Sequence, residues 1–181
     1  MNRTLRIALL SLPLVLAAPA RAEDARVSRP GPENQKLGYF VGKWKGTAMA
    51  RENPFLPAGT FTSTETCEWF EGRYAVVCRS TGKGPAGTSK GITILGWSGE
   101  EKAYLYYGLD STPMAMTTVP KGTLEGDTWT FIDDARMGGQ MVKSRYVMKV
   151  RSKDAYDFRW EMLAPDGQWK AVMEGVAHRS R

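Results

Sequence analysis

Residues 141–151, MVKSRYVMKVR, and residues 155–163, AYDFRWEML, alternate between two kinds of side chain along the chain. One face of each segment is mostly apolar, and the other carries the charges. The apolar faces comprise Val142, Ser144, Tyr146, Met148 and Val150 in the first segment and Tyr156, Phe158, Trp160 and Met162 in the second. This alternation is typical of antiparallel strands that bury one face and expose the other. The two segments are therefore predicted to form a hairpin.

Similar segments, separated by Gly, Pro and Asp, fill most of the chain on both sides of this hairpin. They are Trp44 to Glu52, Thr60 to Phe70, Arg73 to Thr81, Gly91 to Trp97, Ala103 to Leu109, Met114 to Val119, Asp127 to Asp133, and a last strand with Trp169, Ala171, Met173, Gly175 and Ala177 on one side. No convincing helix follows Gly42. About ten short antiparallel strands indicate an all-β fold, either a closed barrel or a sandwich, since closure removes exposed edges.

The N-terminus has the order of a secretory signal peptide. Arg3 and Arg6 precede the apolar run 7–18, and Ala20 and Ala22 mark a cleavage site. The run is shorter than the ~20 residues that span a bilayer, so no stable membrane insertion is expected. We therefore predict a signal peptide at 1–22, a flexible lead-in at 23–36 and a barrel domain at 37–181, in a periplasmic or secreted protein. A short helix opening at Pro32 and ending before Gly42 is expected to plug the barrel.

The charge of the chain is modest once the signal peptide is removed. The formal net charge of +6 falls to +3, because Arg3, Arg6 and Arg21 leave without any acidic residue. The remaining Lys and Arg residues alternate with acids and apolar residues and form no stripe. Nucleic acid is therefore not expected as a partner. No residue pattern indicates an oligomeric state.

Cys67 and Cys78 are the only cysteines in the chain. They lie on either side of Gly72-Arg73, which is predicted to be a two-residue hairpin loop. In that register the cysteines face each other at a hydrogen-bonded pair, where Cα atoms lie about 5.5 Å apart. This spacing permits a disulfide, and an exported chain meets an oxidising compartment. A catalytic free thiol is the alternative, but no histidine lies nearby in the sequence.

The stretch from Leu37 to Gly46, LGYFVGKWKG, resembles the opening of calycin-type barrels, the lipocalins and their relatives. In those proteins a short helix leads into a G-x-W motif on the first strand, and Gly42 and Trp44 match that motif. The mature chain is more closely similar to a bacterial family known as domain of unknown function 1579. That similarity rests on the same opening, Gly72-Arg73-Tyr74, Gly96-Trp97, Tyr106-Tyr107-Gly108 and the closing strand.

The lipocalin resemblance implies that Trp44 packs at the closed end of the barrel under a basic residue from the last strand. Counting by twos from Trp169 places Arg179 on the same inward face. Arg179 is therefore predicted to lie against the Trp44 ring.

A metal site or a bound cofactor is not predicted. The single histidine, His178, cannot supply a ligand cluster. Some related small barrels use a histidine near the C-terminus as a haem ligand, but His178 shares its face with Lys170 and Glu174. A solvated histidine is therefore favoured.

The predicted barrel interior contains the candidate ligand-binding residues. Alternation puts polar and aromatic side chains inside, namely Glu65, Ser80, Tyr107, Ser144, Tyr146 and Trp160. A carboxylate among hydroxyl groups in an apolar shell is a candidate functional group, because burying an unpaired charge is costly. The alternative is that Glu65 lies at a rim or pairs with an arginine.

Three functions remain open from the sequence. The first is a protein that binds a small apolar or amphipathic ligand inside the barrel. The second is an isomerase or cyclase with Glu65 as acid or base and Tyr107 or Tyr146 as its partner. The third is a filled barrel that acts only through its surface.

Overall fold

The chain forms a closed antiparallel barrel of ten strands in the computed structural model, which describes residues 29–112 and 118–181. Each strand pairs with its neighbours in sequence, and β1 and β10 close the barrel. The strands are β1 Gly42–Ala50, β2 Gly59–Trp69, β3 Ala75–Gly84, β4 Gly87–Ser98, β5 Ala103–Asp110, β6 Lys121–Glu125, β7 Thr128–Met137, β8 Gln140–Ser152, β9 Ala155–Leu163 and β10 Trp169–Ser180. The predicted all-β barrel is confirmed. Within the described residues, no helix combines the length and the apolar character needed to cross a membrane.

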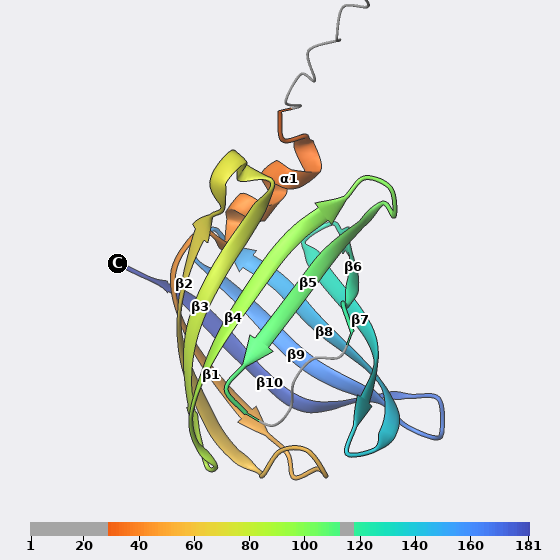
Figure 1. Cartoon of the computed structure of the whole chain (residues 1–181). Coiled ribbons are helices and arrows are strands. Elements are labelled where there is room, and N and C mark those ends of the chain that lie inside the picture. The colour runs from red at the N-terminus through yellow and green to blue at the C-terminus, as the bar shows by residue number, and fades with distance from the viewer. Residues whose placement is uncertain (1–28, 113–117) are drawn as a thin grey trace, which may run out of the picture.

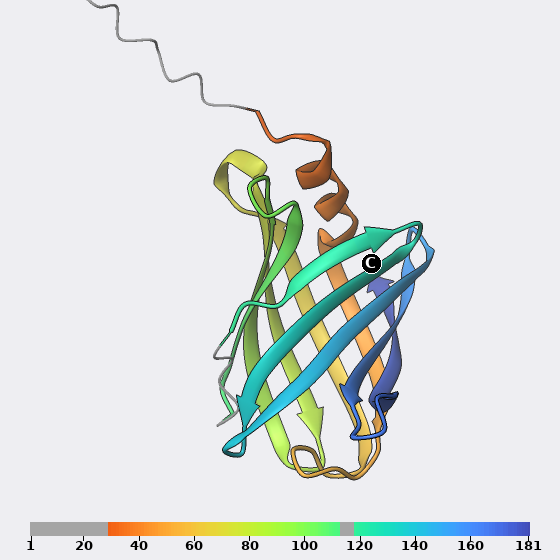
Figure 2. The same ribbon diagram turned by 90° about the vertical axis from the view of Figure 1, so that its right-hand side faces the viewer.

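A short helical segment covers one end of the barrel (Figures 1 and 2). It consists of α1, Pro32–Lys36, and a 3-10 turn, Leu37–Phe40, in which Leu37 and Phe40 are buried. Asn34 on α1 is buried as well, and its Nδ2 donates to the Tyr74 carbonyl over 2.9 Å. The short helix predicted to open at Pro32 is confirmed, and it includes the last five residues of the predicted lead-in, 23–36. The predicted signal peptide, 1–22, lies outside the described residues.

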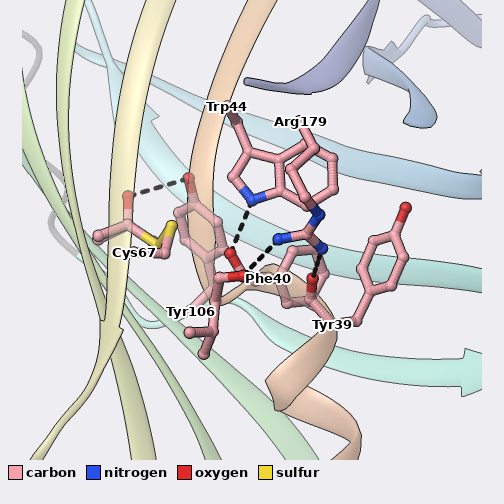
Figure 3. Close-up of a disulfide and its surroundings, with 9 residues drawn as sticks. Tyr39, Phe40, Trp44, Cys67, Tyr106 and Arg179 are labelled. Carbon is pink, nitrogen blue, oxygen red and sulfur yellow. Dashed lines mark hydrogen bonds between the residues drawn. A yellow bond between two sulfur atoms is a disulfide. The ribbon is translucent and has the colours of Figure 1, made fainter. Parts of the chain in front are cut away.

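The cation of Arg179 lies at the helix-covered end, where the first and last strands meet (Figure 3). Its guanidinium carbon is 4.2 Å from the centroid of the Trp44 ring, and its Nη atoms donate to the carbonyls of Val41 and Tyr39. Trp44 is 2% exposed and donates from Nε1 to the Phe40 carbonyl over 2.7 Å. The last strand, the first strand and the 3-10 turn are thus joined by two side chains.

The β2–β3 hairpin keeps the predicted register but has a longer loop. Cys67 pairs with Cys78 and forms a disulfide with it. The Phe70 N–H donates to the Ala75 carbonyl, so the loop spans residues 71–74 instead of Gly72-Arg73 alone. Lengthening the loop by one residue pair shifts the hydrogen-bonding phase, which places the cysteines at a close, non-hydrogen-bonded pair. Their Cα atoms are 3.9 Å apart, and not the expected 5.5 Å.

The sixth strand differs from the prediction. We expected it at Met114 to Val119, of which residues 114–117 lie outside the described residues, and the structure has it at Lys121–Glu125. Glu125 pairs with Thr128 across a tight turn, in which Gly126 takes a φ of 60°. That left-handed conformation suits glycine, and the turn places Asp127 before β7 and not at the predicted start of that strand.

The last strand carries a bulge that changes which side chains face inward. Its pairing with β9 shifts between Ala171, opposite Glu161, and Met173, opposite Trp160. Because an inserted residue reverses the alternation, Trp169 and Ala171 do not share a face with Met173 as predicted. Trp169 instead packs against Arg145, whose guanidinium carbon is 4.5 Å from the ring centroid.

The closure by Arg179 is tested by the substitution Arg179→Lys. A lysine keeps the charge but cannot pair two carbonyls and stack on an indole at once, so we expect a loss of about 2 kcal/mol in the free energy of unfolding. Urea denaturation followed by tryptophan fluorescence measures the change. Arg79→Lys, at an exposed position on β3, serves as the control and should change stability by less than ~0.5 kcal/mol. Equal losses in both variants would contradict the proposed role of Arg179.

Candidate functional site

An inner cavity of about 240 Å³ lies within the barrel and has two unlike walls. Small residues of β1, β2 and β3 form one wall, and aromatic residues of β5, β8 and β9 form the other. The small residues are Gly46, Ser63, Ser80 and Gly82, and the aromatic ones are Tyr106, Tyr146, Tyr156 and Phe158. A Cβ atom added at Gly46 would lie 2.5 Å from the Ser63 Oγ. Gly46 is therefore closely packed against Ser63, and the cavity lies beyond the short side chains of this wall.

The aromatic wall continues the contacts of Trp44 as an unbroken series of rings. The Trp44 and Tyr156 centroids are 5.1 Å apart, and those of Tyr156 and Phe158 are 6.3 Å apart. Tyr146 follows Phe158 at 6.0 Å, and Tyr106 follows Tyr146 at 6.1 Å. These distances and the tilted planes are typical of packed aromatic pairs, which hold one another in place. The five rings form an arc, called the aromatic arc below.

Glu65 lies on β2, on the inner face between Trp44 on β1 and Ser80 on β3. It lines the inner cavity, as the alternation of its strand predicts. Burial raises the pKa of its carboxyl to about 7. Glu65 is half-buried, and within the described part of the chain no hydrogen bond or ion pair from a protein group reaches its carboxyl. Glu65 therefore lines the inner cavity, and no arginine pairs with its carboxyl among the described residues.

The tyrosines of the aromatic arc face the same space. Burial raises the pKa values of Tyr106, Tyr146 and Tyr156, and the nearby charge of Glu65 raises them further. All three hydroxyls therefore stay protonated at neutral pH and can donate hydrogen bonds. Only that of Tyr106 has a partner among the described residues, the Thr93 Oγ1 at 3.4 Å.

A second cavity of about 320 Å³ adjoins the inner one and is lined by residues from the end of the barrel away from α1. We call it the mouth cavity; Phe55, Pro120 and Gly138 contribute loop atoms to it. Two predicted site residues, Ser144 and Trp160, line this cavity and not the inner one. The two cavities share Tyr106, Tyr146 and Met173 in their walls, so they lie end to end.

The prediction for Tyr107 is wrong. This side chain is 45% exposed on the outer surface, and the neighbouring Tyr106 faces the cavity instead. Strand β5 has apolar side chains on both faces, so alternation alone does not tell which face is inside. Its pairing with β4 decides, because Tyr106 lies opposite the buried Leu95 and Tyr107 opposite the exposed Ile94.

Sequence reasoning also missed the cavity roles of Tyr156 and Gly46. Alternation predicts Tyr156 on the inner face, but it does not predict the contact with Trp44, because that contact depends on how β9 curves around the barrel. Gly46 follows Trp44 by two residues, so strand alternation carried a usable signal that it faces inward.

The arrangement offers no set of metal ligands within residues 29–112 and 118–181. Glu65, Cys67 and Cys78 bring their ligand atoms within 4.8 Å of one another, but both sulfur atoms are held in the disulfide (Figure 3). Cysteine binds a metal as the thiolate, which a disulfide does not provide. His178 is exposed on the outer face of β10.

The raised pKa of Glu65 predicts a specific dependence of stability on pH. Because the folded pKa of about 7 exceeds the ordinary glutamate value of 4.5, the folded state binds more protons between these values, and stability should fall as pH rises from 4.5 to 7. The total contribution is on the order of 3 kcal/mol. In Glu65→Gln, the free energy of unfolding measured with urea should no longer decrease between pH 4.5 and 7. The variant should therefore be more stable than the parent above pH 7.

The control for this experiment is Glu68→Gln, at an exposed position on the same strand. It should leave the slope between pH 4.5 and 7 unchanged. A slope that persists in Glu65→Gln would show that another group is responsible.

Two solved structures have a fold similar to that of this barrel. The structure is similar to that of Rv2717c from M. tuberculosis, with a TM-score of 0.58, 13% identity and coverage of 84% of this chain and 99% of that one. It is also similar to the S-type phycobiliprotein lyase CPES from Guillardia theta, with a TM-score of 0.54, 13% identity and coverage of 82% and 93%. At these identities the likeness shows a shared fold. No curated protein matches the sequence. The model of a family of unknown function, DUF1579, matches residues 29–179, and the chain belongs to that family.

Proposed function

We propose that this protein is an exported binding protein that holds a small amphipathic molecule inside the barrel. The observation that carries the proposal is the inner cavity itself, with its small-residue wall, its aromatic arc and the unpaired carboxyl of Glu65. Ligand sites in proteins are typically concave and mostly apolar, with a few polar groups that fix the orientation of the ligand. Glu65 and the tyrosine hydroxyls have that arrangement.

The geometry supports a route for the ligand as well as a site. The mouth cavity joins the inner cavity at Tyr106, Tyr146 and Met173. Methionine is flexible and adapts to ligands of different shape. We infer that a ligand enters from the mouth and that Met173 and the two tyrosines form the threshold. Ser144 and Trp160 then contact the outer part of a longer ligand.

Export is part of the proposal and rests on two observations. The disulfide between Cys67 and Cys78 is typical of oxidising compartments. The order of residues at the N-terminus is typical of a signal peptide.

An enzymatic role is the second candidate, and the pKa of Glu65 favours it. A carboxyl with a pKa of about 7 can both donate and accept a proton near neutral pH. Tyr146 is the partner within the same cavity, whereas Tyr107 lies outside it. Glu65→Gln separates the two functions, because it should abolish turnover of a substrate but weaken the binding of a ligand only modestly.

Occupancy of the cavity is tested by a pair of neighbouring substitutions. Ser63→Phe places a ring inside the cavity, and Thr64→Phe places the same ring on the exposed outer face of β2. With the neutral fluorescent probe N-phenyl-1-naphthylamine, we expect binding to weaken at least about tenfold in Ser63→Phe and to stay unchanged in Thr64→Phe, because only the first fills the site.

Native mass spectrometry of the protein isolated from its own periplasm provides the complementary measurement. A retained small molecule that Ser63→Phe excludes supports the binding function. Equal probe binding by both variants, with no retained molecule, would favour a barrel that acts only through its surface.

A further inference from the structure

The inner cavity contains one carboxyl group, that of Glu65, and the cation in the same row of the sheet, Arg179, lies two strands away. Trp44 on β1 pairs with Glu65 on one side and with Arg179 on the other. Strands are spaced about 4.8 Å apart, so the backbones of Arg179 and Glu65 lie about 10 Å apart. The Arg179 guanidinium is stacked on Trp44, bonded to the Tyr39 carbonyl and paired with Asp154 at 3.3 Å. It is therefore not available to neutralise Glu65.

The other groups that face Glu65 are neutral. Tyr106 on β5, Tyr146 on β8 and Tyr156 on β9 are the titratable groups around it, and the protonated phenols carry no charge. The remaining polar groups in the wall are hydroxyls of serine and threonine. Within the described residues, no lysine, arginine or histidine lines the inner cavity. In the inner cavity, a ligand that carries positive charge would thus meet one carboxylate and no competing cation. The charged residues of the mouth cavity, Asp133 and Arg136, do not line the inner one.

The aromatic arc adds a second attraction for the same kind of group. The faces of aromatic rings carry negative charge density, and they attract organic cations that lie within about 6 Å of the ring centroid. Five rings of the arc and the carboxylate of Glu65 border a cavity of about 240 Å³. Phe61 on β2 supplies a further ring to the same wall as Glu65. Aromatic rings beside a single anion are an arrangement that recognises amines.

We propose that the inner cavity selects a small organic cation, a protonated amine with an apolar substituent, whose nitrogen binds between Glu65 and the aromatic arc. The inference rests on the proposed binding function and specifies the class of its ligand. The apolar substituent extends toward Met173 and the mouth cavity. A neutral ligand would leave the carboxylate unpaired, and an anionic ligand would be repelled unless Glu65 takes up a proton.

The raised pKa of Glu65 agrees with a cationic ligand. Its pKa is raised because burial is not offset by any partner, so the empty site disfavours the charge. A bound ammonium group would restore the missing partner and lower the pKa.

Three probes of nearly equal shape test the charge preference. These are 2-phenylethylamine, 2-phenylethanol and phenylacetate, which differ in the group at one end and carry positive, zero and negative charge. Isothermal titration calorimetry at pH 8, above the pKa of Glu65, gives the dissociation constants. We expect the amine to bind at least about tenfold more tightly than the alcohol, and phenylacetate to bind most weakly, because only the amine forms a charge-assisted pair.

Glu65→Gln identifies the carboxylate as the source of the preference. The amide is similar in shape but carries no charge, so the amine and the alcohol should bind with dissociation constants within about threefold of each other. The alcohol should bind the variant about as well as it binds the parent. Glu68→Gln removes a charge from the outer face of the same strand and should preserve the full preference. The ranking in the parent protein is decisive even if a variant fails to fold.

The possible outcomes separate this inference from the function on which it rests. If the alcohol binds the parent as tightly as the amine, the cavity is a binding site without a charge preference, and the inference is wrong. If phenylacetate binds most tightly, the site pairs a protonated Glu65 with an acid, which also overturns the inference. If none of the three probes binds, and N-phenyl-1-naphthylamine does not bind either, the binding function itself fails.

Discussion

The contact between Arg179 and Trp44 is the constraint on which the rest of this barrel depends. A barrel has no free sheet edges only if its first and last strands pair, and here that pairing ends where the guanidinium stacks on the indole. The same guanidinium binds the Val41 and Tyr39 carbonyls, and the Trp44 indole binds that of Phe40, so the N-terminal 3-10 turn is fixed across the barrel end. The guanidinium of Arg179 therefore both closes the sheet and holds the segment that covers its end.

This arrangement has a consequence for the interior. Arg179 uses its donors on backbone carbonyls and its face on Trp44. Glu65 lies on the same inner face, next to Trp44 and two strands from Arg179. The small side chains of the first three strands leave room next to this carboxyl, and the aromatic arc supplies the opposite wall. A filled core would need larger residues at Ser63 and Ser80. The cavity and its unpaired acid therefore arise from the same part of the sequence that begins the barrel.

Strand alternation predicted the interior correctly where one face is polar. On β8 the charged residues of the outer face leave a single choice, and Ser144 and Tyr146 line the cavities. On β2 the apolar residues Phe61 and Trp69 mark the inner face, and Glu65 shares that face. The prediction failed where both faces are apolar, as for Tyr107 on β5, and where the alternation is interrupted, as at the bulge between Ala171 and Met173. In each case the pairing with a neighbouring strand supplies the missing information, and that pairing is not local in sequence.

The sequence by itself determined the all-β class, the strand count, the pairing of Cys67 with Cys78 and the inward side of Glu65. These properties follow from the alternation of side chains and from turn residues, which act over a few positions along the chain. Only the tertiary structure decided that Glu65 has no partner, that Trp44 stands between it and Arg179, and that five rings face it across an open space. The reason is that charge pairing and cavity volume depend on which strands become neighbours when the barrel curves and closes.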